Sequence, residues 1–210
     1  MTSQYLPTGT VYGTLLNFQA ERAVLAAQMS QPPYKVPPQA PVLYIKTANT
    51  WNANGVSVPV PARVSQVEVG ATVAMVIGPV TQYVLMNDLS IPHASYFRPP
   101  VKFKCLDGFL GIGSHLVTAD DPAAFKLEVH VNGALQQTVD FSNLVRNAQM
   151  LIRDVVEFMT LREGDVLMLG CDCLPGGGRP LATVGDVIQI SSPSHPALGV
   201  LVSTLTAETL

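Results

Sequence analysis

The sequence predicts a mainly β protein with few helices, of the α+β class. Short runs rich in β-branched and aromatic residues recur along the chain, and 17 prolines and 16 glycines separate them. Such punctuated runs are typical of strands joined by turns. Only two segments have the composition of a convincing helix. A chain of 210 residues can form one domain, or at most two small ones, with a sizeable core.

The composition argues against several functional classes. The net charge is -3 and there is no basic cluster, which argues against nucleic-acid binding. No apolar run is long enough to span a membrane, and the first seven residues lack the basic and apolar parts of a signal peptide. We therefore expect a soluble cytoplasmic protein. Three cysteines, an odd number, suggest no disulfide framework.

The N-terminal part predicts a strand, a helix and a connector. Residues 10–17 alternate loosely as a strand does, and residues 20–29 contain helix formers without a breaker. Residues 31–38 carry four prolines, which lack a backbone donor and restrict the preceding residue, so this segment is a connector. Residues 42–46 are a β-branched and aromatic run and form the next predicted strand.

The remainder of the chain continues mainly as strands. Residues 64–77 alternate and then become continuously apolar, as in a strand that enters a covered sheet. The pair Asn132-Gly133 is typical of a tight hairpin turn. Further elements are predicted as hairpin strands at 126–131 and 135–139, a helix at 143–158 capped by Asp140 or Ser142, and strands beginning near 166 and 187.

The stretch from residue 83 to residue 113 concentrates groups that can do chemistry. An apolar run ends at Asp88, a loop carries His93 and Arg98, and Lys104 and Asp107 precede a turn rich in glycine. Only 13% of the residues are charged, so this cluster at a strand end is a candidate binding site.

Three motifs in this stretch resemble the core signature of the fumarylacetoacetate hydrolase family. They are NDLS at 87–90, RP at 98–99 and KCLDGF at 104–109, within a similarity that extends over roughly residues 12–187. Within the family, the chain is most similar to the N-terminal half, or small subunit, of bacterial bifunctional isomerase/decarboxylases. The resemblance implies a mixed β-roll like the C-terminal domain of fumarylacetoacetase. It also implies that residues 1–40 form a lid-like segment and residues 41–210 the β-roll.

The resemblance assigns roles to the charged residues of the stretch. Lys104 would lie over the oxygen of a substrate enolate, Asp107 would orient that lysine or help to form its loop, and Asp88 would line the floor of the pocket. The alternative for Lys104 and Asp107 is a structural ion pair that holds the loop.

Three further residues would bind substrate according to the resemblance. Lys46 or Arg98 would pair with a substrate carboxylate, and Cys171 occupies the place of a threonine that contacts substrate in relatives. The alternative for Lys46 is a solvated residue at a strand end. His93 has no triad partner by spacing, and a solvated or capping role is the better interpretation.

The family's divalent metal, magnesium or manganese, has an incomplete ligand set in this chain. Relatives place two glutamates where Gly70 and Thr72 stand here, so Asp88 is the only retained ligand position. A hard divalent ion prefers six or more oxygens, usually from more than one carboxylate. We therefore predict no metal ligands, and Glu68 is a poor substitute because it lies about 7 Å along the strand from Gly70.

Two functions from different classes remain open. The first is an enzyme subunit that isomerises or decarboxylates unsaturated seven-carbon 2-oxo diacids, as a homodimer or with a metal-binding homologous subunit. The second is a catalytically degenerate scaffold for such a partner, favoured by the lost glutamates and by a shortened segment before Asp88. The enzyme would belong to aromatic-acid catabolism, and a ligand-binding homodimer outside that pathway is a third possibility. The lid also lacks the histidine with which relatives activate water, which argues against hydrolysis.

Overall fold

The computed structural model describes residues 4–33, 35–93 and 100–208. Within them the helices are α1 (Gln19–Met29), α2 (Val101–Lys104) and α3 (Ala148–Val156), and none is long and apolar enough to cross a membrane. Short 3₁₀ turns lie at Ala48–Thr50, Pro122–Ala124, Phe141–Asn143 and Pro196–Leu198. The strands are β1 (Val11–Leu15), β2 (Val42–Lys46), β3 (Trp51–Ala53), β4 (Val58–Val60), β5 (Val67–Glu68), β6 (Ala71–Val76), β7 (Gln82–Asp88), β8 (Leu110–Ile112), β9 (Lys126–Val131), β10 (Ala134–Asp140), β11 (Val166–Met168), β12 (Leu181–Ala182), β13 (Val187–Ser191) and β14 (Val200–Ala207).

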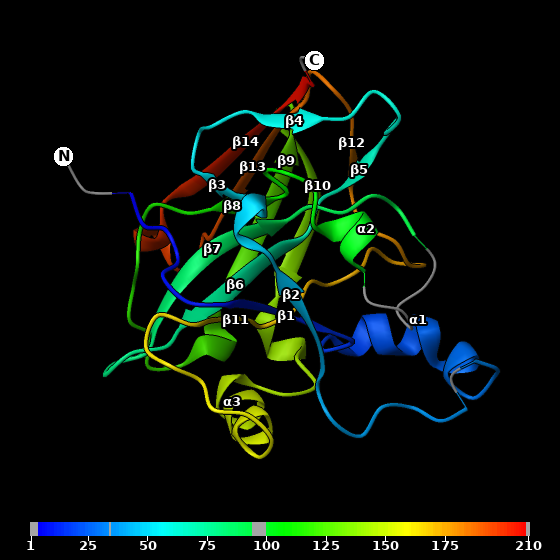
Figure 1. Ribbon diagram of the computed structural model, residues 1–210, viewed down its shortest axis with the longest axis vertical. Helices are drawn as coiled ribbons and strands as arrows, with labels where there is room; N and C mark the ends of the chain where they lie inside the picture. Colours follow the sequence, from blue (N-terminus) through cyan, green and yellow to red (C-terminus); the bar gives the residue numbers. More distant parts are fainter. Residues whose placement is uncertain (1–3, 34, 94–99, 209–210) are drawn as a thin grey trace.

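Two large sheets form the body of the molecule (Figure 1). The first has seven strands in the order β2-β1-β11-β6-β7-β8-β3, and the second has five in the order β10-β9-β13-β14-β4. A small third sheet pairs β12 with β5. The prediction of a mainly β protein with few helices is confirmed.

The main core lies between the two large sheets. Val73 and Leu85 of the seven-stranded sheet belong to the same buried cluster as Leu127, Val129 and Ile190 of the five-stranded sheet. A second buried cluster covers the other face of the seven-stranded sheet. Strands buried on both faces read as continuous apolar runs, which is why residues 71–76 and 83–86 lack alternation.

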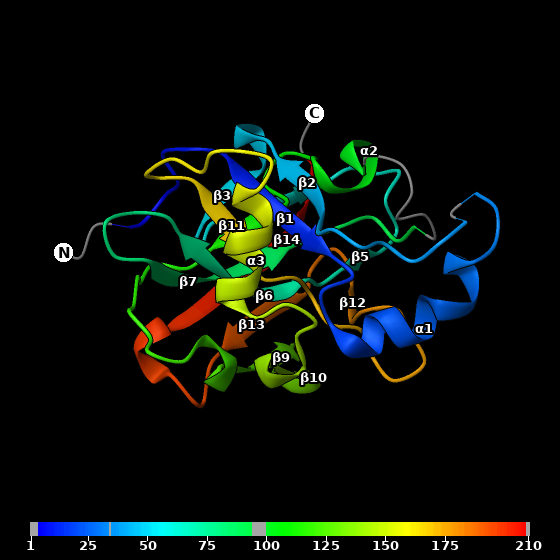
Figure 2. The ribbon, with the colours of Figure 1, turned by 90° about the horizontal axis from the view of Figure 1, so that it is seen from below.

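The N-terminal segment contributes one strand to the seven-stranded sheet and one helix beside it. Strand β1 lies inside the seven-stranded sheet, antiparallel to β2 and parallel to β11. Helix α1 follows it and lies at the side of the molecule in both views (Figures 1 and 2). The strands expected at 10–17 and 42–46, the helix at 20–29 and the hairpin about Asn132-Gly133 are therefore confirmed, with positive φ at both turn residues.

Two predicted elements differ from the structure. The strand expected at 64–77 is broken at Gly70, so that β5 pairs with β12 while β6 joins the seven-stranded sheet. The helix expected at 143–158 begins only at Ala148, because Asp140 caps a separate 3₁₀ turn. The cap of α3 is Asn147, whose side chain accepts a hydrogen bond from the Met150 backbone N–H at 2.9 Å.

Strands β3, β4, β8, β12 and β14 were not predicted. Two of them, β8 and β14, have sequences that carry weak strand signals. Strand β8 lies inside the stretch that its glycines suggested was a turn; a Cβ at Gly111 would lie 2.9 Å from the Ser203 hydroxyl, so the close packing of β8 against β14 favours glycine. Strand β14 is the longest in the described chain, with 8 residues, but serine and threonine interrupt its apolar pattern.

Candidate functional site

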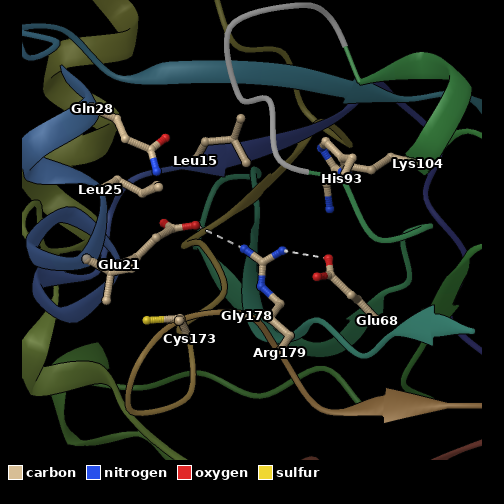
Figure 3. A pocket seen from close by; sticks show the side chains of 12 residues that line it. Leu15, Glu21, Leu25, Gln28, Glu68, His93, Lys104, Cys173, Gly178 and Arg179 are labelled. Carbon is tan, nitrogen blue, oxygen red and sulfur yellow. Dashed lines mark hydrogen bonds and ion pairs between the residues drawn. The ribbon is translucent and has the colours of Figure 1, made fainter. Parts of the chain in front are cut away.

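A cavity of about 240 Å³ lies between α1, β5 and the loop that connects β11 to β12 (Figure 3). Its charged and titratable lining residues are Glu21 from α1, Glu68 from β5, His93, Lys104 from α2, and Cys173 and Arg179 from the loop. Apolar side chains of β1 and α1 complete the wall. The cavity is at the small end of the usual size of ligand sites and combines an apolar wall with a few convergent polar groups.

Lys104 lines the cavity and belongs to a buried cluster of charges whose other members lie behind the cavity wall. Its Nζ lies 2.6 Å from Oδ2 of Asp88, and Nζ of Lys46 lies 3.0 Å from Oδ1 of the same carboxylate. All three residues are at most 1% exposed. The Tyr44 hydroxyl also donates to Oδ2 of Asp88. One carboxylate is thus shared by two ammonium groups and one phenol, and the cluster carries a formal charge of one positive unit.

Lys46 is held more deeply than Lys104. Its ammonium group donates to the backbone carbonyl of Phe109 at 2.7 Å, to that of Leu89 at 3.4 Å, and to that of Lys104. It does not line the cavity. The interpretation of Lys46 as a solvated strand-end residue is therefore wrong, because β2 directs this side chain into the protein.

The electrostatics of the cluster follow from burial and pairing. Burial alone would raise the pKa of Asp88, but Lys104 and Lys46 hold that pKa far below its ordinary range. Burial lowers the pKa of Lys46, and the Asp88 carboxylate opposes this shift. Burial and the neighbouring Asp88 charge raise the pKa of the Tyr44 phenol, so it stays a hydrogen-bond donor. The Asp88 carboxylate is therefore ionised throughout the physiological range.

Arg179 and its partner Glu21 are cavity residues that sequence reasoning missed. The guanidinium of Arg179 is the central group of this pair. It lies 3.1 Å from a carboxylate oxygen of Glu21 and 4.0 Å from one of Glu68 (Figure 3). The Arg179 side chain is 11% exposed. The available signal was a basic residue directly after three glycines in a chain with only 12 lysines and arginines. The sequence showed a loop there but not that the loop turns inward.

The remaining predicted site residues separate in space. The Asp107 carboxylate accepts a hydrogen bond from the Asn49 side chain at 2.6 Å and borders a different cavity, so the alternative of a Lys104–Asp107 ion pair is wrong. Cys171 is buried, and burial raises the pKa of its thiol to about 12. His93 lines the cavity and stacks on Phe103, which differs from the solvated or capping role expected for it. Arg98 lies outside the described residues.

The sequence matches the family profile described as "Fumarylacetoacetate (FAA) hydrolase C-terminal" over residues 10–206. The chain belongs to the fumarylacetoacetate hydrolase family. It is also 33% identical, over 207 residues, to the 4-hydroxyphenylacetate degradation bifunctional isomerase/decarboxylase of Escherichia coli. That similarity covers 90% of this chain and 46% of the relative, so the chain spans about half the length of the relative.

Solved structures share the fold of this family member. The 2-hydroxyhepta-2,4-diene-1,7-dioate isomerase from Mycobacterium marinum superimposes with a TM-score of 0.74 at 21% identity, over 99% of this chain and 78% of that one. The maleylpyruvate hydrolase from Sphingobium, solved with manganese(II) and pyruvate, gives a TM-score of 0.71 at 20% identity, over 97% and 72%. The mixed β-roll of the family is thus the fold of this chain.

The divalent metal that the family resemblance implies does not fit the donor groups of this family member. The Asp88 carboxylate already faces two ammonium groups, which repel a divalent cation. The Thr72 hydroxyl donates to the Gly170 carbonyl at 2.6 Å. No group of three or more His, Cys, Asp or Glu side chains in the described residues is arranged to hold a metal ion.

Gly70 marks a point where the backbone itself excludes a side chain. A Cβ at this position would lie 2.3 Å from the Asp88 carbonyl oxygen, which is backbone and cannot rotate away. We expect Gly70→Ala to lower the free energy of unfolding by about 1–3 kcal/mol, as other overpacking substitutions do. Chemical denaturation measures the change. Gly78→Ala is the matched control, because its Cβ would lie 3.6 Å from the Val80 carbonyl oxygen, an ordinary contact. An equal loss of stability in both variants would contradict the packing argument.

Proposed function

We propose that the chain is a subunit of an isomerase/decarboxylase that acts on unsaturated seven-carbon 2-oxo or 2-hydroxy diacids. The substrates proposed are the seven-carbon diacid 2-hydroxyhepta-2,4-diene-1,7-dioate for isomerisation and, for decarboxylation, 5-carboxymethyl-2-oxo-hex-3-ene-1,7-dioate, which has one further carboxylate that leaves as carbon dioxide. The observation that carries the proposal is the ammonium group of Lys104, which lies at the wall of the cavity and is backed by Asp88 and Lys46.

The reaction places a negative charge on the oxygen at carbon 2. Loss of carbon dioxide, or movement of a proton along the diene, passes through an enolate at this position. Lys104 stabilises that oxygen in a site of low dielectric, where a fixed positive charge is worth more than in water. Asp88 holds Lys104 in place, and Lys46 prevents Asp88 from neutralising it fully. The chain's own residues therefore supply the positive charge that the reaction requires.

The proposal extends to the N-terminal segment and to the assembly. Helix α1 supplies Glu21, Val24, Leu25 and Gln28 to the cavity wall, which supports a lid-like role for residues 1–40 over the β-roll of residues 41–210. We propose that the chain works in the cytoplasm as a homodimer, or together with a metal-binding homologous subunit.

A second candidate function is a scaffold that supports a catalytic homologue. It is favoured by Gly70, where the backbone leaves no room for a ligating side chain. The two functions differ in the turnover expected of the isolated chain: an enzyme subunit would convert substrate by itself, and a scaffold would not.

The test is an assay of the purified chain with 2-hydroxyhepta-2,4-diene-1,7-dioate in the presence of EDTA. Isomerisation is followed as loss of the ultraviolet absorbance of the hydroxydiene. The enzyme proposal expects turnover above the uncatalysed rate. A scaffold gives no turnover alone. Mixed with a metal-binding homologue and assayed with metal and without EDTA, a scaffold supports the same rate of turnover whether or not it carries Lys104→Ala.

A further inference from the structure

Arg179 has no part in the chemistry described so far, although it occupies the middle of the cavity. Figure 3 shows its guanidinium between Glu21 and Glu68, with Lys104 and His93 across the cavity. The side chain makes a hydrogen bond to Glu21 at 3.1 Å, and the contact with Glu68 is longer, at 4.0 Å. Its Nε is buried without a hydrogen-bond acceptor among the described residues. The guanidinium thus has donor capacity to spare.

The loop that carries Arg179 is built to hold it in place. Gly176, Gly177 and Gly178 all have positive φ, a conformation that other residues rarely adopt. Two backbone hydrogen bonds at 2.8 Å, between Leu174 and this glycine run, close the loop. Gly177 also approaches α1 so closely that a Cβ would lie 3.0 Å from a methyl carbon of Val24. The glycine run therefore serves to turn the chain inward and present Arg179 to the cavity.

A 2-oxo acid needs two positively charged contacts, one for the oxygen at carbon 2 and one for the adjacent carboxylate. Lys104 supplies the first in the proposed function. Of the two residues expected to bind the carboxylate, Arg98 lies outside the described residues. Lys46 is buried below the cavity wall, where three carbonyl groups and Asp88 engage its ammonium group. Among the described residues that line the cavity, Arg179 is the cation that remains for the second contact.

We propose that Arg179 binds the carboxylate of the 2-oxo acid, taking the substrate carboxylate in place of Glu21. A guanidinium presents a rigid planar fork of donors that matches a carboxylate with two parallel hydrogen bonds. Arg179 is thus a substrate-binding residue that determines specificity for acids over their neutral esters. The inference rests on the proposed function for the identity of the ligand.

The charges of the cavity explain why Glu21 is the group that yields. Lys46, Lys104 and Arg179 are balanced by Asp88, Glu21 and Glu68, so an incoming dianion must compete with a resident carboxylate. Glu21 lies 3.1 Å from the guanidinium and occupies its donors, whereas Glu68 lies 4.0 Å away, so a substrate carboxylate has to displace Glu21. Burial also raises the pKa of Glu21 against the pull of Arg179. Glu21 also accepts a hydrogen bond from the Leu16 backbone N–H at 2.7 Å, and an amide oxygen can keep that bond.

The two partners of this ion pair should have opposite effects on ligand binding. We expect Arg179→Gln to weaken the binding of oxalate, a planar mimic of a 2-oxo acid enolate, at least tenfold. We expect Glu21→Gln to strengthen it severalfold, because the substitution frees the guanidinium. Isothermal titration calorimetry of the full chain in EDTA measures both constants, and EDTA removes metal ions that would bind oxalate themselves.

The controls separate binding from folding and from turnover. Arg153→Gln removes a guanidinium paired with Asp154 on the surface and should leave oxalate binding unchanged. If the Arg179–Glu21 pair were merely structural, both substitutions would change the affinity for oxalate in the same direction. That result would overturn the inference. So would unchanged oxalate binding by Arg179→Gln, or a complete lack of oxalate binding by the unaltered chain. Opposite shifts in a chain that turns over no substrate would uphold the role of Arg179 and refute the proposed enzyme function alone.

Discussion

Lys104→Ala is expected to lower turnover by a factor of about 10²–10³, the usual effect of removing one donor that stabilises a developing oxyanion. The ammonium group lies at the cavity wall and is held 2.6 Å from Asp88, so it needs no reorganisation when the enolate forms. The fold should survive the change. Asp88 keeps its contact with Lys46 at 3.0 Å, and the cluster loses its excess positive charge. Steady-state kinetics and circular dichroism measure the two effects.

Lys102→Ala is the matched control for this prediction. Lys102 lies on the same short helix, α2, but its side chain is exposed and borders the other cavity. Its replacement should leave turnover within about twofold, since exposed charges at this distance are screened by salt. Turnover by Lys104→Ala equal to that of Lys102→Ala would remove Lys104 from the mechanism.

Asp88→Asn is expected to lower the free energy of unfolding by about 3–5 kcal/mol. The substitution keeps the shape of the side chain but leaves two buried ammonium groups without a counter-charge, and breaking a buried pair in this way is strongly destabilising. Chemical denaturation of both proteins at pH 7 gives the difference. Asp140→Asn is the control, because its ion pair with Lys126 is largely exposed and should contribute about 1 kcal/mol or less.

The same carboxylate predicts how the stability difference depends on pH. The pKa of Asp88 in the folded protein lies below the value of about 3.9 expected in the unfolded chain. Its contribution is therefore complete above the unfolded pKa and is lost as the pH falls through the folded pKa. The gap between the native protein and Asp88→Asn should be constant from about pH 5 to 7 and shrink below about pH 4. A gap that stayed constant into the acid range would contradict this assignment.

Sequence reasoning identified residues that can be recognised from their immediate neighbours in the chain. Asp88 follows a continuous apolar run, and Lys104 belongs to a motif shared with the family, so both were found without coordinates. The hairpin about Asn132-Gly133 was equally clear, because both residues tolerate the positive φ that the turn requires.

Residues that depend on long-range packing could not be found in this way. Glu21 and Arg179 are 158 positions apart, and only the packing of the glycine loop against α1 brings them together. Asp107 belongs to the same motif as Lys104, yet the end of α2 separates the two side chains. Proximity in sequence suggested an ion pair there, whereas the partner of Lys104 is Asp88, 16 positions earlier at the end of β7.

The sharing of the Asp88 carboxylate between two lysines has a consequence for how this charged cluster forms. Both positive charges that face Asp88 are carried on side chains of this chain, so the cluster is complete once the chain has folded. Lys46 lies at the end of β2, Asp88 at the end of β7 and Lys104 at the end of α2, so the cluster exists only where these three elements meet. A chelator, which removes bound metal ions, cannot remove these side-chain charges.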